Sequence, residues 1–257
     1  MSLKFTASNH RYVMDGKPVK GVTTLLNAGL PKPQLVNWAA RTVAEYVADN
    51  EDEMATLRSM GREPMVNALK VVHNMKRDAA AVRGTEVHAI AERVVHGEAV
   101  EVAPHLAPYV NGYVEWLDRF DVTPVLTERS VGNRKHWYSG RFDLVADVGG
   151  TRWLLDAKTS RGVYGSVGLQ LAAYRAAEFY VNDDDPDTEY AMPEGIERLG
   201  VMHITDTGTT LIPFDSSDVP FRIFTHVAYL AKHIQTIEKF RLDPVYDLTE
   251  LENPAHD

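Results

Sequence analysis

Hydrophobic positions in the first 120 residues alternate briefly and then recur at helical spacing. The runs RYVM (11–14) and KPVKGVTTLL (17–26) are joined by Asp15-Gly16, a strong signal for a hairpin turn. From about 34 to 50, apolar residues recur every three or four positions, which predicts a helix. Similar spacing predicts further helices at 53–60, 64–79, 84–96 and 104–119. We therefore expect a mainly helical N-terminal half after an initial hairpin.

The pattern changes near Val122 to extended runs rich in aliphatic and aromatic residues. Three of them predict a three-stranded antiparallel unit with a turn at Gly149-Gly150: PVLTERSV, HWYSGRFDLVADV and TRWLLDAKT. After this unit we expect a helix at 165–181, an acidic surface loop (NDDDPDTEY), a hairpin around Thr207-Gly208, a helix at 217–240 and a loose tail (ELENPAHD).

These elements predict one α/β domain over residues 1–257. Residues 1–120 would be its mostly helical part, and residues 121–245 would carry the sheet and its helices. The 44% apolar content is typical of a globular chain. No apolar stretch reaches the length of a membrane span and no signal core is present, so we expect no membrane partner and a cytoplasmic location.

Cysteine content and charge restrict the chemistry further. The chain has no cysteine, which excludes disulfides, a cysteine-held iron–sulfur cluster and a cysteine nucleophile. The net charge is −9, which argues against non-specific coating of nucleic acid. Residues 129–161, however, hold seven basic residues and three acids. A polyanion would therefore be expected to contact the middle of the chain.

The most informative stretch joins Gly140-Arg141-Phe142-Asp143 to Asp156-Ala157-Lys158. Side chains alternate along a strand, so Asp156 and Lys158 point to the same face. Pairing about the glycine turn places residue i opposite residue 299 − i, and Asp143 opposite Asp156. Two carboxylates and a lysine would then share one face of the sheet.

Neighbouring carboxylates repel each other unless a cation compensates them. Oxygen ligands favour Mg²⁺ or Mn²⁺, and Lys158 could orient a water, deprotonate it or stabilise a phosphate. The alternative is an ordinary Asp–Lys–Asp cluster on a sheet surface.

Two helices carry further candidates. His88 and Glu92 are four residues apart on one helical face, where the imidazole could bind a metal that carboxylates hold. Gln170 and Tyr174 likewise share a face and could bond a phosphate or the lysine amine. For both pairs, ordinary packing against the sheet is the alternative interpretation.

Taken in order, the motifs G-x-x-x-H, G-R-F-D, D-A-K-T and Q-L-A-A-Y over residues 84–178 resemble the PD-(D/E)XK nuclease superfamily. The similarity is to its RecB-like and lambda-exonuclease-like branch, in particular to phage-encoded members, which GVTTLLNAGLPKPQLVNWAAR also resembles. The resemblance implies a restriction-endonuclease-like core, a central mixed β-sheet flanked by helices. This chain departs from many CRISPR-associated relatives in lacking the four cysteines that bind their iron–sulfur cluster. It also has no ATP-binding GxxxxGK[ST] motif.

Matched by position, the resemblance implies a role for each candidate. Asp143, Asp156, His88 and the backbone carbonyl of Ala157 would hold the metal, and Lys158 would activate the attacking water. Gln170 and Tyr174 would position Lys158 and the scissile strand. Glu92 matches no metal position and could act as a second-shell or second-metal group.

The resulting hypothesis is an Mg²⁺-dependent or Mn²⁺-dependent deoxyribonuclease, most directly an exonuclease leaving 5′-phosphates in phage-type recombination, repair or replication. The DNA backbone would contact five basic residues: Arg129, Arg134, Lys135, Arg141 and Arg161. Trp137 or Tyr138 could stack on an unpaired base, or could pack across the strands. The alternatives are a catalytically inactive nucleic-acid-binding or assembly module and a structure-specific endonuclease. A single-strand annealing or other recombination protein is a further expected partner, and an oligomer is compatible with the branch. If the chain is phage-encoded, its location would be the host cytoplasm.

Overall fold

A seven-stranded mixed sheet forms the centre of the protein in a computed structural model, which describes residues 2–6 and 9–241. Its strand order is β10-β9-β6-β5-β4-β7-β8, and β6 and β9 are the parallel neighbours while the other pairs are antiparallel. The strands are β4 (Val122–Asn133), β5 (Tyr138–Val148), β6 (Thr151–Lys158), β7 (Phe179–Asn182), β8 (Asp185–Ala191), β9 (Arg198–Thr205) and β10 (Gly208–Phe214). A separate three-stranded sheet contains β1 (Leu3–Thr6), β2 (Arg11–Met14) and β3 (Lys17–Val19).

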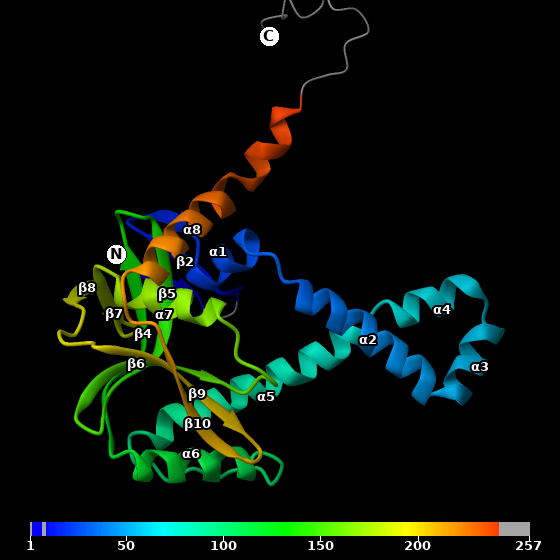
Figure 1. The fold of residues 1–257 in the computed structure, drawn as a ribbon, viewed down its shortest axis with the longest axis horizontal. Helices are drawn as coiled ribbons and strands as arrows, with labels where there is room; N and C mark the ends of the chain where they lie inside the picture. The colour runs from blue at the N-terminus through cyan, green and yellow to red at the C-terminus, as the bar shows by residue number, and fades with distance from the viewer. Residues whose placement is uncertain (1, 7–8, 242–257) are drawn as a thin grey trace, which may run out of the picture.

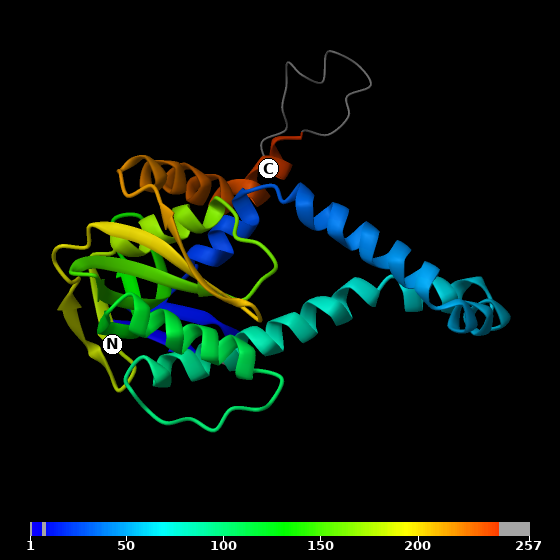
Figure 2. The same ribbon diagram turned by 60° about the horizontal axis from the view of Figure 1, so that its bottom comes forward.

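Helices cover both faces of the large sheet, as Figures 1 and 2 show. On one face α1 (Val22–Gly29), α7 (Ser166–Arg175) and α8 (Val219–Ile237) enclose a core that includes Val145 and Leu154. On the other face α6 (Ala107–Arg119) and the C-terminal part of α5 (Val72–Val94) cover Leu144 and Leu155. Adjacent residues of β5 and β6 thus point into opposite cores, as strand geometry requires.

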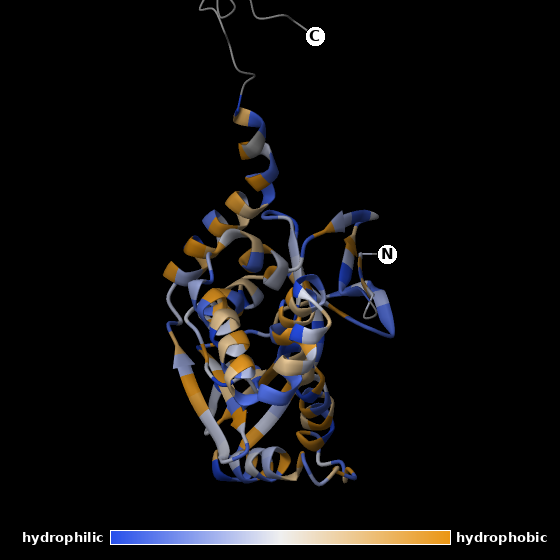
Figure 3. Cartoon of the chain, turned by 90° about the vertical axis from the view of Figure 1, so that its right-hand side faces the viewer, coloured by the Kyte–Doolittle hydropathy of each residue, from blue (hydrophilic) through white to orange (hydrophobic). Residues whose placement is uncertain are grey.

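A helical arm projects from this body (Figure 1). It contains α2 (Pro33–Asp49), α3 (Glu51–Ser59), α4 (Arg62–Leu69) and the beginning of α5. Helix α5 runs from the arm back to the sheet and therefore carries His88 to the body. In Figure 3, apolar and polar segments alternate along the helices. No helix among the described residues combines the length and apolar character that a membrane crossing needs.

The sequence predicted the three-stranded unit and its register. Leu144 pairs with Leu155 and Val148 with Thr151, as the 299 − i rule requires, and β9 and β10 form the predicted hairpin. The predicted helix at 34–50 corresponds to α2, and 217–240 to α8 with the short helix η2 (Glu238–Phe240). The expected α/β class, with helices on both sides of a mixed sheet, is confirmed.

Several boundaries were wrong. The run 17–26 is extended only to Val19, because Val22–Gly29 form α1, whose buried Val22, Leu25 and Leu26 pack on the sheet. The helix expected at 165–181 ends at Arg175, and residues 179–182 pair with β4 as a strand. The acidic NDDDPDTEY segment is largely strand β8 rather than a loop. It lies at the edge of the sheet and pairs with β7 alone, and an edge strand tolerates proline and charged residues. The helices predicted at 64–79 and 84–96 are replaced by α4 and the continuous α5. The predicted loose tail lies outside the described residues.

Candidate metal and phosphate site

Asp143 lies where β5 and β6 begin to separate. The paired register ends at Leu144 and Leu155, and beyond it the Asp143 Oδ2 accepts a 2.6 Å hydrogen bond from the backbone N–H of Ala157. The same oxygen is 3.5 Å from Nδ1 of His88, on helix α5. The carboxylate thus bridges the parting strands and faces α5.

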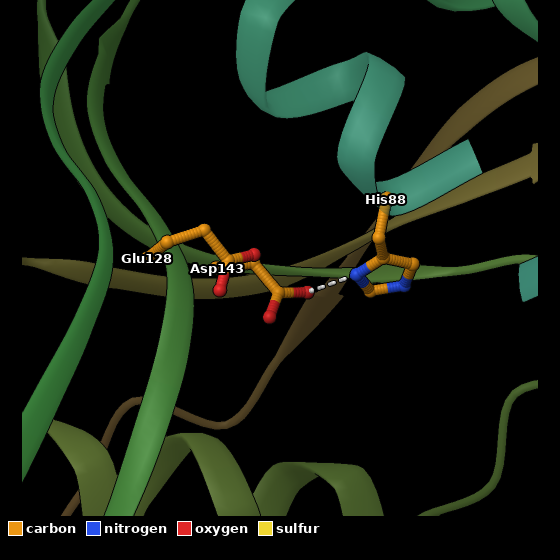
Figure 4. A group of neighbouring side chains, drawn as sticks. All are labelled: His88, Glu128 and Asp143. Carbon is orange, nitrogen blue, oxygen red and sulfur yellow. Dashed lines mark ion pairs between the residues drawn. The ribbon is translucent and has the colours of Figure 1, made fainter. Parts of the chain in front are cut away.

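His88 and Asp143 form a three-residue group with Glu128, shown in Figure 4. One ligand atom from each lies within 4.8 Å of the other two. Glu128 comes from β4, where its φ of +50° is unusual for a residue with a side chain. Such strain persists where the surrounding structure enforces it, and it often occurs at functional sites.

Burial disfavours the charged forms of both carboxylates of this group, although Arg141 pairs with Glu128 at 2.7 Å. Desolvation, with the charge of nearby Asp156, raises the pKa of Asp143 to about 7. Desolvation, with the charge of Asp143, likewise raises the pKa of Glu128 to about 7. Desolvation lowers the pKa of His88, which keeps the imidazole neutral and its lone pair available. The group therefore offers a neutral imidazole nitrogen and two carboxylates whose ionised forms a divalent cation would stabilise.

Asp156 and Lys158 form a second pair beside this group. Nζ of Lys158 is 2.6 Å from Oδ2 of Asp156, and Nε2 of Gln170 donates a 2.5 Å hydrogen bond to Oδ1. Asp156 is 2% exposed. Burial disfavours the Lys158 ammonium, but the Asp156 and Asp143 carboxylates outweigh burial and raise its pKa. Lys158 is therefore a fixed cation at neutral pH.

The predicted site residues converge, but not on one face of the sheet. Asp143 contacts α5, whereas Asp156 contacts Gln170 of α7 on the opposite layer. Glu128, rather than Asp156, completes the three-residue group of side chains, and Ala157 lines the same cavity. Glu92 lines the cavity next to that group. Tyr174 is 3% exposed, and its ring packs so closely on Gly140 that a Cβ there would lie 2.3 Å from Cε1.

Most of the basic residues predicted to contact DNA are already engaged by the protein. Arg134 pairs with Asp15 and Glu189 and lies over the Phe179 ring. Arg141 pairs with Glu128 and Asp183.

The other three basic residues predicted to contact DNA differ in their surroundings. Arg129 donates from Nη1 to the carbonyl of Thr127. Lys135 and Arg161 are exposed. The local positive charge counted from the sequence is therefore partly neutralised by distant acids.

The expected stacking aromatics do not line the site. Tyr138 is fully buried and its hydroxyl donates a 2.8 Å hydrogen bond to the carbonyl of Ala173, so it packs across the layers. Trp137 donates from Nε1 to the carbonyl of Pro18 at 3.3 Å. The aromatic residues that line the cavities beside the site in the described part of the chain are instead Tyr113, on α6, and Phe5, on β1.

Sequence reasoning missed Glu128 and Phe5. Glu128 interrupts an otherwise extended run as an isolated acid, TERS, and this was its one sequence signal. Its backbone geometry and its pairing with Arg141 arise from tertiary structure.

Comparison of the chain with models of known protein families gives no match. Comparison with curated protein sequences gives no match either. Any functional conclusion therefore depends on the geometry of the site and on the motif resemblance.

Proposed function

We propose that this protein is a divalent-metal-dependent deoxyribonuclease with a restriction-endonuclease-like core. It would act as an exonuclease that leaves 5′-phosphates. The observation that carries the proposal is the juxtaposition of two centres. A metal-ligand group of His88, Glu128 and Asp143 lies next to a lysine that Asp156 and Gln170 hold in place. Phosphodiester hydrolysis needs a cation near the phosphate and a second stabiliser for the charge that develops.

The donors fit Mg²⁺ or Mn²⁺. His88, Glu128 and Asp143 would hold the ion, because their carboxylates are hard oxygen ligands and the neutral imidazole is a ligand that Mn²⁺ accepts. The ion, when bound, polarises a phosphate oxygen and lowers the pKa of a coordinated water. The absence of cysteine leaves no thiolate ligand for an iron–sulfur cluster.

Lys158 would act as a cation rather than as a base. Its raised pKa keeps the ammonium protonated, so it can donate hydrogen bonds to a phosphate oxygen and stabilise added negative charge. Asp156 holds Nζ on one side, and Gln170 fixes the orientation of Asp156 through the other carboxylate oxygen. Gln170 is therefore a positioning residue, and Tyr174 supports the same helix from the core.

Digestion of three end-labelled substrates tests the proposal: linear duplex, linear single strand and covalently closed circular DNA. We expect nucleotides to be released from linear DNA with Mg²⁺ or Mn²⁺ and none with chelator. Nicking of the circle would instead identify an endonuclease. Intact DNA in every reaction would contradict nuclease function and favour a binding or assembly module with the same fold.

A further inference from the structure

A cavity of about 580 Å³ opens directly beside the metal-ligand group and shares His88 and Glu128 with it. Its size falls within the range of ligand pockets, about 300–1,000 Å³. Helix α5 forms one wall with Ala89, and β1 contributes Phe5 to another. Neither the metal-ligand group nor the Lys158 pair requires a space of this size.

The lining of this pocket suits a planar, largely apolar group. The Arg141 guanidinium carbon is 5.7 Å from the centre of the Phe5 ring, which also stacks on Tyr12 with the ring centres 4.8 Å apart, so the two groups form one fixed aromatic and guanidinium surface. Arg141 is fixed by a 2.7 Å hydrogen bond to Glu128 and by a pair of bonds to Asp183 at 2.8 and 2.9 Å. Aromatic rings and guanidinium planes are the surfaces on which proteins stack unpaired bases.

The pocket also contains polar groups with unused hydrogen-bonding capacity. Ser130 is 1% exposed, and its hydroxyl has no hydrogen-bond partner within the described part of the chain. Burying a hydroxyl without a hydrogen-bond partner costs free energy. Its position in the pocket wall therefore points to a ligand group that forms the missing hydrogen bond. The Asn182 amide, at the end of β7, also lines the cavity and can both donate and accept.

The charges of the pocket argue against an anion inside it. Among its described lining residues, the carboxylates of Glu92, Glu128 and Asp183 outnumber the cations of Lys4 and Arg141. Arg141 is moreover neutralised by two of these acids. A phosphate would be repelled here, whereas a neutral heterocycle would not.

We infer that this pocket receives one unpaired nucleobase, from the nucleotide next to the phosphate at the metal-ligand group. The inference rests on the proposed function for the position of that phosphate, and it defines the substrate as single-stranded or frayed DNA. A base held in a duplex cannot enter, because both its faces are stacked and its edge is paired. The base would stack on the single surface that Phe5 and Arg141 form on the pocket side, and Ser130 and Asn182 would provide edge contacts.

Ala89 allows the pocket to be filled without disturbing the core, because it is exposed on α5. The test compares Ala89→Trp with Ala80→Trp, an exposed position on the same helix that does not line the pocket. Each protein is titrated with a fluorescent single-stranded oligothymidylate and with a fully abasic oligomer of equal length and charge. Ca²⁺ replaces Mg²⁺ to suppress cleavage, and fluorescence anisotropy gives Kd.

We expect the wild type and Ala80→Trp to bind the base-containing strand about tenfold or more tightly than the abasic strand, the scale of base stacking on an aromatic group. In Ala89→Trp this preference should disappear, while affinity for the abasic strand is retained. Phe5→Leu should reduce the preference several-fold. An undiminished preference in Ala89→Trp, or none in the wild type, would overturn the inference.

The binding assay separates this inference from the proposed function. A protein that cleaves DNA in Mg²⁺ without base preference would retain the nuclease proposal and lose the pocket. A protein that cleaves nothing, yet has a base preference that Ala89→Trp removes, would retain the pocket as a nucleic-acid-binding site.

Discussion

Lys158→Ala is expected to lower the rate of DNA cleavage by about 100- to 1,000-fold, the cost of removing one donor that stabilises charge in a transition state. Lys158 is the cation held beside the metal-ligand group, at 2.6 Å from Asp156. Single-turnover cleavage of labelled linear DNA in Mg²⁺ measures the effect. Lys70→Ala, which removes an exposed lysine at the end of α4, should leave the rate within about twofold.

Folding must be separated from catalysis in this experiment, because Lys158→Ala leaves Asp156 buried with an unpaired charge. Breaking a buried pair by removing one partner costs roughly 3–5 kcal/mol. The double variant Lys158→Ala, Asp156→Asn removes that charge and should recover part of the lost Tm while remaining inactive. Cleavage at the wild-type rate by either folded variant would exclude Lys158 from the mechanism.

The second large effect is on stability, and its sign follows from the raised pKa of Asp143. The Asp143 carboxyl has a pKa of about 7 in the folded protein, against the ordinary value of 3.8 expected in the unfolded chain. It therefore binds its proton more tightly when the protein is folded. The free energy of unfolding that this group contributes is therefore lost as pH rises from about 4 to about 7. Glu128, whose pKa is also about 7, acts in the same direction.

Asp143→Asn should consequently stabilise the metal-free protein, and the gain in Tm over wild type should grow between about pH 4 and about pH 7. A gain of about 1 kcal/mol corresponds to about 2–4 °C for a chain of this size. Asp147→Asn is the matched control, because its pairing with Arg152 lowers the Asp147 pKa and its removal should not stabilise.

Above pH 7, Mg²⁺ should make the wild type more stable than Asp143→Asn, the reverse of their order in the metal-free state. The ion compensates the ionised carboxylates in the wild type and raises its Tm, whereas Asp143→Asn has lost a ligand and should respond weakly. Thermal unfolding followed by circular dichroism, with and without Mg²⁺, provides all these values. If Asp143→Asn were less stable than the wild type in chelator between about pH 4 and about pH 7, the assigned electrostatics would be contradicted.

The sequence predicted the site where local rules decide the geometry. Gly149-Gly150 set a hairpin register that runs from Val148–Thr151 to Leu144–Leu155 and so brings Asp143 and Asp156 to the same end of the pair. That register did not reveal that the two side chains face opposite layers. The strand alternation then placed Lys158 beside Asp156, and helical spacing placed Gln170 on the buried side of α7. Each of these inferences depends on a few neighbouring residues.

Features that depend on distant parts of the chain were not predictable in this way. Glu128 enters the site because β4 pairs with β5, with Thr127 opposite Leu144 and Arg129 opposite Phe142, and its positive φ there is one that its residue type disfavours. Arg134 loses its predicted availability to Asp15 and Glu189, at sequence separations of 119 and 55 residues. The edge strand β8 forms because β7 offers it a partner, against the low strand propensity of its acidic sequence.

The most direct test measures Mn²⁺ occupancy and cleavage rate on the same samples, with electron paramagnetic resonance reporting free Mn²⁺. We expect wild-type cleavage of linear single-stranded DNA to rise in proportion to bound Mn²⁺ and to saturate with it. Asp143→Asn should shift both curves together to higher Mn²⁺ concentration, because Asp143 is one of the three candidate ligands, with His88 and Glu128. Full cleavage by Asp143→Asn at wild-type Mn²⁺ concentrations, or saturation of the wild-type site with no cleavage, would contradict a metal-dependent nuclease built on this group.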